Sequence, residues 1–431
     1  MSPRLFQVSE DDAERVACEI AARRPDHRGL VQSIAHIIAD VRRRGDAALL
    51  EYTRQFNGAD LTGLGLRIER REIDAAYRDL SPRLRRALER MAENIKAVAR
   101  LQLSRLRFSR RLHGGVEITL RAYPLQSVGC YIPGGVAAYP STALMTTIPA
   151  KVAGVKRIAV CTPPNNKGEV SKPVLAALKI AGVEEAYRVG GPQAIAALAY
   201  GTETIKPVAK IIGPGGGYVT AAKLAVSSDV AIDMPAGPTE LVVYSDDERL
   251  AEDVMYELCA QAEHSTDTLV GLVTTDERLA SAVLEGMEVF MSRFERSEII
   301  SKSWDENGFV ATCKSREAAA RLINEIAPEH VSIISKNPSR MAEMITSAGL
   351  VSLGAHTSTA LCDYVVGVNH VLPTSGYAKL RGGLSILDYV RLVFSVRASK
   401  RSARSLARYV EELALAEGLP GHALAARRVG E

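Results

Sequence analysis

Short apolar runs alternate with helical runs from about residue 115 onward, and this alternation restricts the fold more than any other feature of the sequence. Runs such as VKRIAVCTPP, ELVVYSDD and HVSIIS are short and rich in β-branched residues, whereas SKPVLAALKIAG and REAAARLINEI carry apolar residues at helical spacing. This order is typical of a parallel sheet covered by helices, and it continues on both sides of residue 240. We therefore predict an α/β fold with two Rossmann-like domains whose sheets are mainly parallel.

The length of the chain, 431 residues, also exceeds what one compact core usually contains. We predict a helical N-terminal arm over residues 1–30 and a first, discontinuous α/β domain formed by residues 31–128 together with 240–380. Residues 129–239 are expected to form the second α/β domain, and residues 381–431 a small helical tail.

The composition favours a small-molecule enzyme over a nucleic-acid or membrane protein. The net charge is only +4, and no basic patch is interleaved with aromatic residues. No apolar run reaches the roughly 18 residues of a membrane span, and the N-terminal stretch MSPRLFQVSEDDAER has no apolar signal core. The six cysteines are isolated, without a CxxC pair, as is typical of a reducing compartment. We predict a cytoplasmic protein.

Two surface stretches have competing interpretations. Residues 100–113 are basic, which favours a solvated face or a subunit contact over an anion site. Residues 401–417 have the pattern of an amphipathic helix. We expect that helix to pack on its own subunit or on a partner rather than on a membrane.

Glycine-rich loops are candidates for ligand binding, because ligands of open α/β sheets bind beyond the carboxyl ends of the strands. Such loops occur at residues 134–135, 190–191 and 213–217. The last, GPGGG, opens a predicted helix whose free N–H groups favour an anion. It matches neither GxGxxG nor a P-loop, so a tight turn without phosphate binding is the alternative.

The stretch EIAPEHVSI (325–333) places Glu329 and His330 at a break between a helical run and an apolar strand. One interpretation is a polar loop. The other is an acid/base pair, because a carboxylate and a neutral imidazole can each serve as general base in a different step. Cys130, by contrast, has no base near it in the sequence and is interpreted as a small buried side chain rather than a nucleophile.

A metal site is a further hypothesis. Gln261 and His264 are three residues apart at the end of a predicted helix, which puts them on one face. With Asp363 and His422 they would form a mixed nitrogen and oxygen ligand set. Against this, a lone histidine is more often structural, Gln is a rare zinc ligand, and no HExxH motif occurs.

Taken together, these motifs resemble one family, the histidinol dehydrogenases. The resemblance covers most of the chain from about residue 115 to residue 425, in the family's order. The matching stretches are VGCYIPGGVAAYPSTALMTTIPAKVAGV (128–155), VGGPQAIAALAYGT (189–202), IDMPAGPTELVV through CAQAEH (232–264), IAPEH (326–330), GVNHVLPTSG (367–376), GGLSILDYV (382–390) and AEGLPGH (416–422).

The resemblance implies an NAD- and zinc-dependent dehydrogenase with one zinc ion per subunit. The family oxidises L-histidinol twice, through L-histidinaldehyde that stays bound, and yields L-histidine in the last step of histidine biosynthesis. The resemblance also implies that His330 accepts the alcohol proton and that Glu329 activates the water that attacks the aldehyde-level intermediate.

Further site residues follow from the same resemblance. The implied zinc ligands are Gln261, His264, Asp363 and His422. The implied substrate contacts are Thr239, Gln261, His264, His330, Asp363, His370, Glu417 and His422. The implied nucleotide contacts are Tyr131, Gln193 and Gly216.

The family is also an intertwined homodimer in which the C-terminal segment serves the partner's site, so exchange of residues 381–431 is implied here; a tail folded on its own subunit would fit the sequence equally. One departure stands out. The family's Gly-Pro-Gly-Asn motif has Gly216 in place of Asn, which removes a side-chain donor for the nucleotide.

Two other functions are compatible with the motifs. A sister enzyme could use the same residues to oxidise another small primary alcohol, such as a sulfonated diol, and a substrate panel separates the two. A non-catalytic nucleotide- or metal-binding relative is the second alternative, and the intact Glu329, His330 and ligand set argue against it.

Overall fold

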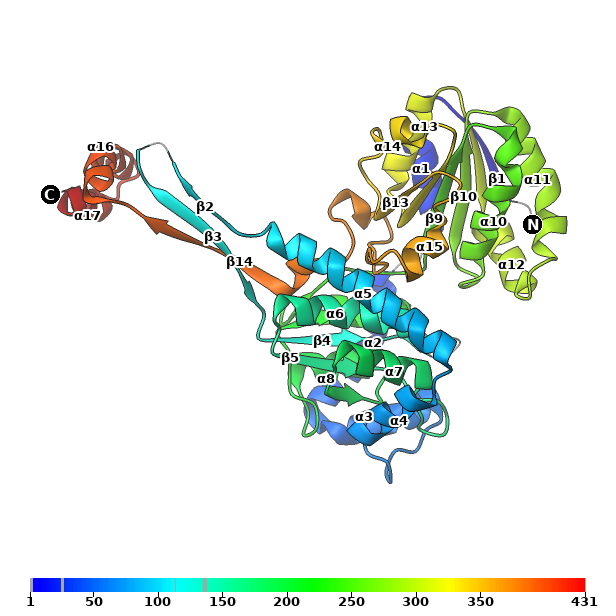
Figure 1. Cartoon of the computed structure of the whole chain (residues 1–431), viewed down its shortest axis with the longest axis horizontal. Helices are drawn as coiled ribbons and strands as arrows, with labels where there is room; N and C mark the ends of the chain where they lie inside the picture. The colour runs from blue at the N-terminus through cyan, green and yellow to red at the C-terminus, as the bar shows by residue number, and fades with distance from the viewer. Residues whose placement is uncertain (1–2, 25–26, 113, 135–137, 431) are drawn as a thin grey trace.

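The computed structural model describes residues 3–24, 27–112, 114–134 and 138–430, so Gly135 of the predicted loop at 134–135 lies outside the described residues. The chain forms two α/β lobes and a long arm that carries the C-terminal helices away from both (Figure 1). The six-stranded lobe consists of residues 3–24 and 240–364, the five-stranded lobe of residues 27–104, 127–232 and 382–389, and the arm of residues 108–124, without residue 113, and 390–430.

The sheet of the six-stranded lobe is parallel throughout, in the order β1-β11-β10-β9-β12-β13. Alternate residues of its strands enter two cores: Val242 and Tyr244 pack with α1 and α13, and Leu241 and Val243 with α10, α11 and α12. The strands are β1 (Arg4–Val8), β9 (Glu240–Ser245), β10 (Leu269–Thr274), β11 (Phe309–Cys313), β12 (His330–Ile334) and β13 (Leu350–Leu353). The helices are α1 (Ala13–Ala21), η1 (Glu248–Leu250), α10 (Ala251–Ala262), α11 (Glu277–Met291), α12 (Ser297–Asn307), α13 (Arg316–Ile326), α14 (Pro338–Ala342) and α15 (Thr359–Tyr364).

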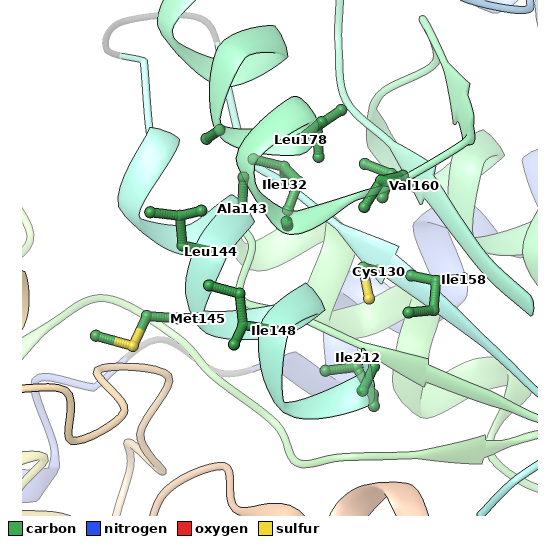
Figure 2. Packing of buried hydrophobic residues seen from close by; sticks show 14 of the residues in the cluster. Cys130, Ile132, Ala143, Leu144, Met145, Ile148, Ile158, Val160, Leu178 and Ile212 are labelled. Atoms are coloured by element: carbon green, nitrogen blue, oxygen red, sulfur yellow. The ribbon is translucent and has the colours of Figure 1, made fainter. Parts of the chain in front are cut away.

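The second sheet is also parallel, in the order β6-β5-β4-β7-β8. One of its cores joins Cys130 and Ile132 to Ile148 of α6 and Leu178 of α7, as Figure 2 shows. The strands are β4 (Ser127–Tyr131), β5 (Arg157–Cys161), β6 (Glu185–Tyr187), β7 (Lys210–Ile212) and β8 (Ala231–Ile232). The helices are α2 (His27–Arg44), α3 (Asp46–Asn57), α4 (Arg70–Asp79), α5 (Pro82–Ser104), α6 (Pro140–Ala153), α7 (Lys172–Ala181), α8 (Gly191–Tyr200), α9 (Gly217–Val226) and η3 (Ile386–Tyr389); η2 (Tyr377–Lys379) lies in the connection that precedes η3.

The predicted α/β class with two parallel sheets is confirmed, but the assignment of residues 31–128 to the domain of residues 240–380 is wrong. Helices α2 and α3 pack on one face of the five-stranded sheet, and α4 and α5 on the other. The prediction failed because an amphipathic helix shows only that one face is buried, and does not show which sheet covers it.

Both ends of the chain also differ from the predicted arm and tail. Residues 4–8 of the predicted helical arm form β1, which pairs with β11 and extends the six-stranded sheet. At the other end, β14 (Val390–Arg397) pairs with β3 (Glu117–Pro124), which pairs with β2 (Phe108–Arg111), in an antiparallel ribbon. The ribbon carries α16 (Lys400–Ala416) and α17 (Pro420–Gly430), which pack on each other.

Among the described residues, no helix combines the length and the apolarity that crossing a bilayer requires.

Candidate active site

A cavity of about 360 Å³ lies where the two lobes face each other. The five-stranded lobe supplies the glycine-rich loop at 214–217, at the carboxyl end of β7, as the sequence predicts. The six-stranded lobe supplies residues at the amino ends of β9 and β12, and this end of the sheet was not predicted. The lining is Pro133, Tyr139, Ser141, Thr142, Pro214, Gly215, Gly216, Gly217, Gly237, Pro238, Thr239, Gln261, His264, Ser265, Asp267, Glu329, His330, Asp363, Tyr364 and His370.

The turn between α13 and β12 brings Glu329 and His330 to the same cavity. Ala327, which caps α13, has φ +47°, a left-handed conformation that costs a non-glycine residue about 1 kcal/mol and reverses the chain sharply. Glu329 precedes β12 and His330 is its first residue, so the two side chains do not alternate across a regular strand. Glu329 Oε1 lies 4.0 Å from His330 Nε2.

Hydrogen bonds fix the Glu329 carboxylate from the neighbouring strand. Its Oε2 accepts from Thr239 Oγ1 at 2.5 Å and from the Glu240 backbone N–H at 3.0 Å. Thr239 Oγ1 in turn accepts from Gln261 Nε2 at 2.6 Å. The bonds form a chain from the end of α10 to the carboxylate and leave Oε1 facing His330.

Burial sets the protonation of both groups. It raises the pKa of Glu329 well above its ordinary value, although the bonds from Thr239 and Glu240 oppose the rise. It lowers the pKa of His330 to about 3, with the nearby His370 and His264 adding to the effect. His330 is therefore a neutral imidazole at pH 7, which can accept a proton.

Three of the four predicted metal ligands line the cavity: Gln261, His264 and Asp363. His264 Nδ1 lies 3.1 Å from the Gln261 carbonyl oxygen, so Nε2 is the ring nitrogen that remains available to a ligand. Asp363 Oδ1 is buried without a hydrogen-bond partner, 3.9 Å from His330 Nε2. Burial and the charge of Glu257 raise the pKa of Asp363 to about 7.

These donors fit a zinc ion chemically, since an imidazole nitrogen and carboxylate and amide oxygens are acceptable ligands and the orphaned oxygen of Asp363 requires a partner. Within the part of the chain that the structure describes, no group of three His, Cys, Asp or Glu side chains is close enough to hold a metal. The described part of a single chain therefore presents no complete set of such side chains.

His370 and Thr142 form another wall of the cavity. His370 Nε2 lies 3.2 Å from Thr142 Oγ1, and its Nδ1 lies 2.8 Å from the Asp363 carbonyl oxygen. Burial lowers the pKa of His370 to about 4. His370 was predicted from the resemblance, but Thr142 was not. The sequence feature that could have indicated Thr142 is the polar pair Ser141-Thr142 at the start of a helix that follows a glycine-rich loop.

The predicted nucleotide residues divide into two groups. Gly216 lines the cavity. Tyr131 and Gln193 do not line it and are buried in the five-stranded lobe, where Tyr131 Oη accepts from the Gly191 backbone N–H at 3.1 Å. Both polar atoms of the Gln193 amide are buried without a hydrogen-bond partner.

His422 and Glu417 are not part of this cavity. Glu417 ends α16 and His422 lies in α17, both exposed, and Figure 1 places these helices at the far end of the arm. Cys130 is fully buried, and burial raises the pKa of its thiol to about 12, as expected of a structural cysteine.

Fold and site together define a class: a two-lobed α/β protein with a glycine-rich loop on one side of its cavity and a buried carboxylate beside a neutral imidazole on the other. A sequence profile of the histidinol dehydrogenases matches residues 21–429. The chain is 43% identical to the histidinol dehydrogenase of Methanopyrus kandleri, with 98% of each chain covered. It is 42% identical to that of Bradyrhizobium diazoefficiens, over 98% of this chain and 97% of the relative.

The crystal structure of histidinol dehydrogenase from Elizabethkingia anophelis is similar over 99% of this chain and 98% of that one, with a TM-score of 0.91 and 33% identity. A match of this coverage includes the arm as well as both lobes. The chain belongs to the histidinol dehydrogenase family.

Proposed function

We propose that this protein is an NAD-dependent oxidoreductase that oxidises L-histidinol through L-histidinaldehyde to L-histidine, the last step of histidine biosynthesis. Full-length similarity to histidinol dehydrogenases supports the substrate. The observation that carries the mechanism is the presence of two different bases, Glu329 and His330, at one cavity.

Two oxidations need two proton acceptors. In the first, His330 accepts the hydroxyl proton while the carbon releases a hydride to NAD⁺, which gives the aldehyde and NADH. In the second, Glu329 takes a proton from the water that adds to the aldehyde carbon, and the hydrate releases a hydride to a second NAD⁺. His330 is neutral at pH 7, so its imidazole is able to accept this proton.

We assign a zinc site to Gln261, His264, Asp363 and His422, with one ion per subunit. The ion would hold the amino alcohol and polarise its oxygen. Around it, Thr239 and His370 would contact the substrate from two walls of the cavity, and Thr239 also keeps the Glu329 carboxylate in place. The unpartnered Asp363 oxygen supports the assignment.

The nucleotide is assigned to the five-stranded lobe, with Gly216 in the glycine-rich loop and with the buried residues Tyr131 and Gln193 of the same lobe. Free N–H groups at the start of α9 would meet the phosphates. The unpaired amide of Gln193 supports this assignment, because a buried amide without partners is rare unless a ligand or a rearrangement satisfies it.

We further propose a homodimer in which each tail completes the partner's site with His422 and Glu417. Within one chain the arm exposes large apolar side chains, among them Phe394, Leu413 and Leu424 at 60–65% exposure, and such surfaces usually mark an interface. Tyr364, which lines the cavity, and Val365, which follows it in the chain, are exposed apolar side chains that a partner's tail would cover. A cytoplasmic location stays a prediction, supported by six free thiols.

A substrate panel tests the proposal. Purified, zinc-loaded protein is assayed for NADH formation with L-histidinol and with other primary alcohols, including a sulfonated diol. We expect kcat/KM for L-histidinol to exceed that of each other alcohol at least about 100-fold, because buried polar groups left unpaired penalise the wrong substrate. A higher kcat/KM for the sulfonated diol would contradict the assignment of L-histidinol as substrate but would still support NAD-dependent alcohol oxidation.

A further inference from the structure

A buried ion pair lies just outside the cavity and has no part in the chemistry described so far. Lys223 of α9 is 1% exposed, and the Asp233 side chain that pairs with it is fully buried. Neither residue lines the cavity. Burying a charge costs free energy, and buried charges persist where they are paired and hydrogen-bonded. The groups that this ion pair binds should therefore explain why it is buried.

The ion pair binds both the N–H and the carbonyl group of Gly213, the first residue of the glycine-rich loop. Lys223 Nζ donates to the Gly213 carbonyl at 2.8 Å, and Asp233 Oδ2 accepts from the Gly213 N–H at 2.8 Å. Gly213 has φ +122°, and a Cβ there would lie 2.2 Å from the Tyr131 carbonyl oxygen. The loop therefore starts in a conformation that only glycine adopts, and the ion pair fixes it.

The same ammonium holds a second segment. Lys223 Nζ also donates to the Met234 carbonyl at 2.8 Å. Met234 belongs to the connection 233–239, which leads from β8 of one sheet to β9 of the other and ends at Thr239. One side chain thus joins the bases of two loops, 213–217 and 233–239, whose tips both line the cavity.

We propose that Lys223 is a positioning residue for NAD⁺: through its ion pair with Asp233 it holds loop 213–217 in the conformation that receives the dinucleotide. The inference rests on the proposed NAD-dependent function. Three consecutive glycines at 215–217 would otherwise be costly to order on binding, by about 1 kcal/mol or more per residue. With Gly216 offering no side-chain donor, the loop binds through its backbone, and a backbone site depends on a fixed shape.

The test uses Lys223→Met and the double variant Lys223→Met/Asp233→Asn. The single variant leaves a buried carboxylate without its cation and can fail to fold, whereas the double variant removes both charges and keeps an oxygen that can accept from Gly213. Lys151→Met, an exposed lysine of α6 in the same lobe, is the matched control. Folding is checked by thermal unfolding, NAD⁺ affinity by calorimetry, and KM and kcat by NADH formation.

We expect the folded double variant to bind NAD⁺ about tenfold more weakly or worse, with KM for NAD⁺ raised by a similar factor and kcat at saturating NAD⁺ within about twofold of wild type. A general structural defect would lower kcat as well. A folded double variant with wild-type NAD⁺ affinity, or a loss confined to kcat, would overturn the inference. Wild-type and control proteins that bind no NAD⁺ would instead overturn the proposed function.

A measurement on the unaltered protein keeps the inference testable if no variant folds. Hydrogen–deuterium exchange without NAD⁺ should show a strongly protected amide at Gly213, because Asp233 already accepts from it in the free protein. Rapid exchange at Gly213 that slows only when NAD⁺ binds would mean that the nucleotide orders the loop, and that result would overturn the positioning role.

Discussion

Glu329 and His330 are adjacent in sequence, yet they differ in how the protein restrains them. The Glu329 carboxylate is bound by Thr239 and by the Glu240 N–H, whereas His330 Nδ1 is buried without a hydrogen-bond partner. The sequence could predict that both face one site, because their types and their place at a break suggest acid/base work. It could not predict the restraint by Thr239, since that contact joins two strands far apart in the chain.

The division of labour between the two bases gives the first prediction. In Glu329→Gln the amide oxygen can still accept from Thr239, so the site should keep its shape while it loses the base that activates water. We expect oxidation of histidinaldehyde to fall about 10²- to 10⁴-fold and oxidation of histidinol to fall much less. Each half-reaction is followed separately by NADH formation, with Thr239→Ser as a control that keeps the hydroxyl. Equal losses in both half-reactions would contradict the assignment.

Gly216 supports a second prediction at this scale. It has φ −62°, and a Cβ added there would meet nothing within 4 Å. Gly216→Asn should therefore fold normally and restore the side-chain donor that the family motif carries. One net hydrogen bond of about 1 kcal/mol would lower the Kd for NAD⁺ about fivefold. An unchanged Kd, measured by calorimetry, would show that the backbone alone already satisfies the nucleotide.

Among the elements, those whose burial shows in a local sequence pattern were predictable, and those that depend on pairing between distant parts of the chain were not. The apolar runs of β9, β10 and β12 enter two cores and are buried throughout, so their composition reveals them. All four residues of β2 are exposed and only Val390 of β14 is buried, so neither strand alternates buried and exposed residues. The pairing of β14 with β3 also spans more than half of the chain, which no local pattern indicates. The short edge strand β1 was not predicted, for the same reason.

Arg24, in the connection between α1 and α2, joins the start of β9 to the end of α13 and supports a prediction about elements. Its guanidinium pairs with Glu240 at the start of β9, with Nε 2.8 Å from Oε1, and donates to the Ile326 carbonyl at 2.7 Å at the end of α13. Both side chains are nearly buried, at 12% and 3% exposure. Arg24→Met would leave the Glu240 carboxylate without its cation, and we expect a loss of about 3–5 kcal/mol in the free energy of unfolding.

That loss should depend on pH. Burial raises the pKa of Glu240, and Arg24 opposes the rise, so its removal raises this pKa further. An acid whose folded pKa exceeds its unfolded pKa binds more protons when folded, so its folded state gains stability as pH falls. Urea unfolding should show the larger deficit of Arg24→Met at pH 8 and a smaller one at pH 5.5, with Arg15→Met on the exposed face of α1 as control. A deficit that is the same at both pH values would contradict this.

For the whole molecule, the structure adds what no single element could indicate, namely that the site lies between a carboxyl end of one sheet and an amino end of the other. The rule that ligands of open sheets bind at the carboxyl ends of the strands predicted the carboxyl end and missed the amino end. It missed the amino end because the relative placement of two lobes depends on long-range packing. His422, a ligand implied by the resemblance, belongs to α17 at the far end of the arm and so lies apart from Gln261, His264 and Asp363 in one chain.

Exchange of tails is testable by complementation. His422→Ala should lose metal, and Glu329→Gln should lose the aldehyde oxidation, so neither homodimer forms histidine at an appreciable rate. If tails are exchanged, a heterodimer of the two variants contains one intact site, made of the His422→Ala body and the other chain's tail. We expect tag-purified heterodimers to form histidine at about half of the wild-type rate. A heterodimer that forms no histidine would mean that each tail serves its own chain.

The most direct test of the double oxidation is a stoichiometry. Zinc-loaded protein is given excess NAD⁺ and a limiting, known amount of L-histidinol, and NADH and products are counted at the end of the reaction. Two bases at one cavity predict two NADH per histidinol, with L-histidine as the product and no free aldehyde. One NADH per histidinol with aldehyde released would contradict the account, because the second base would then have no reaction to serve.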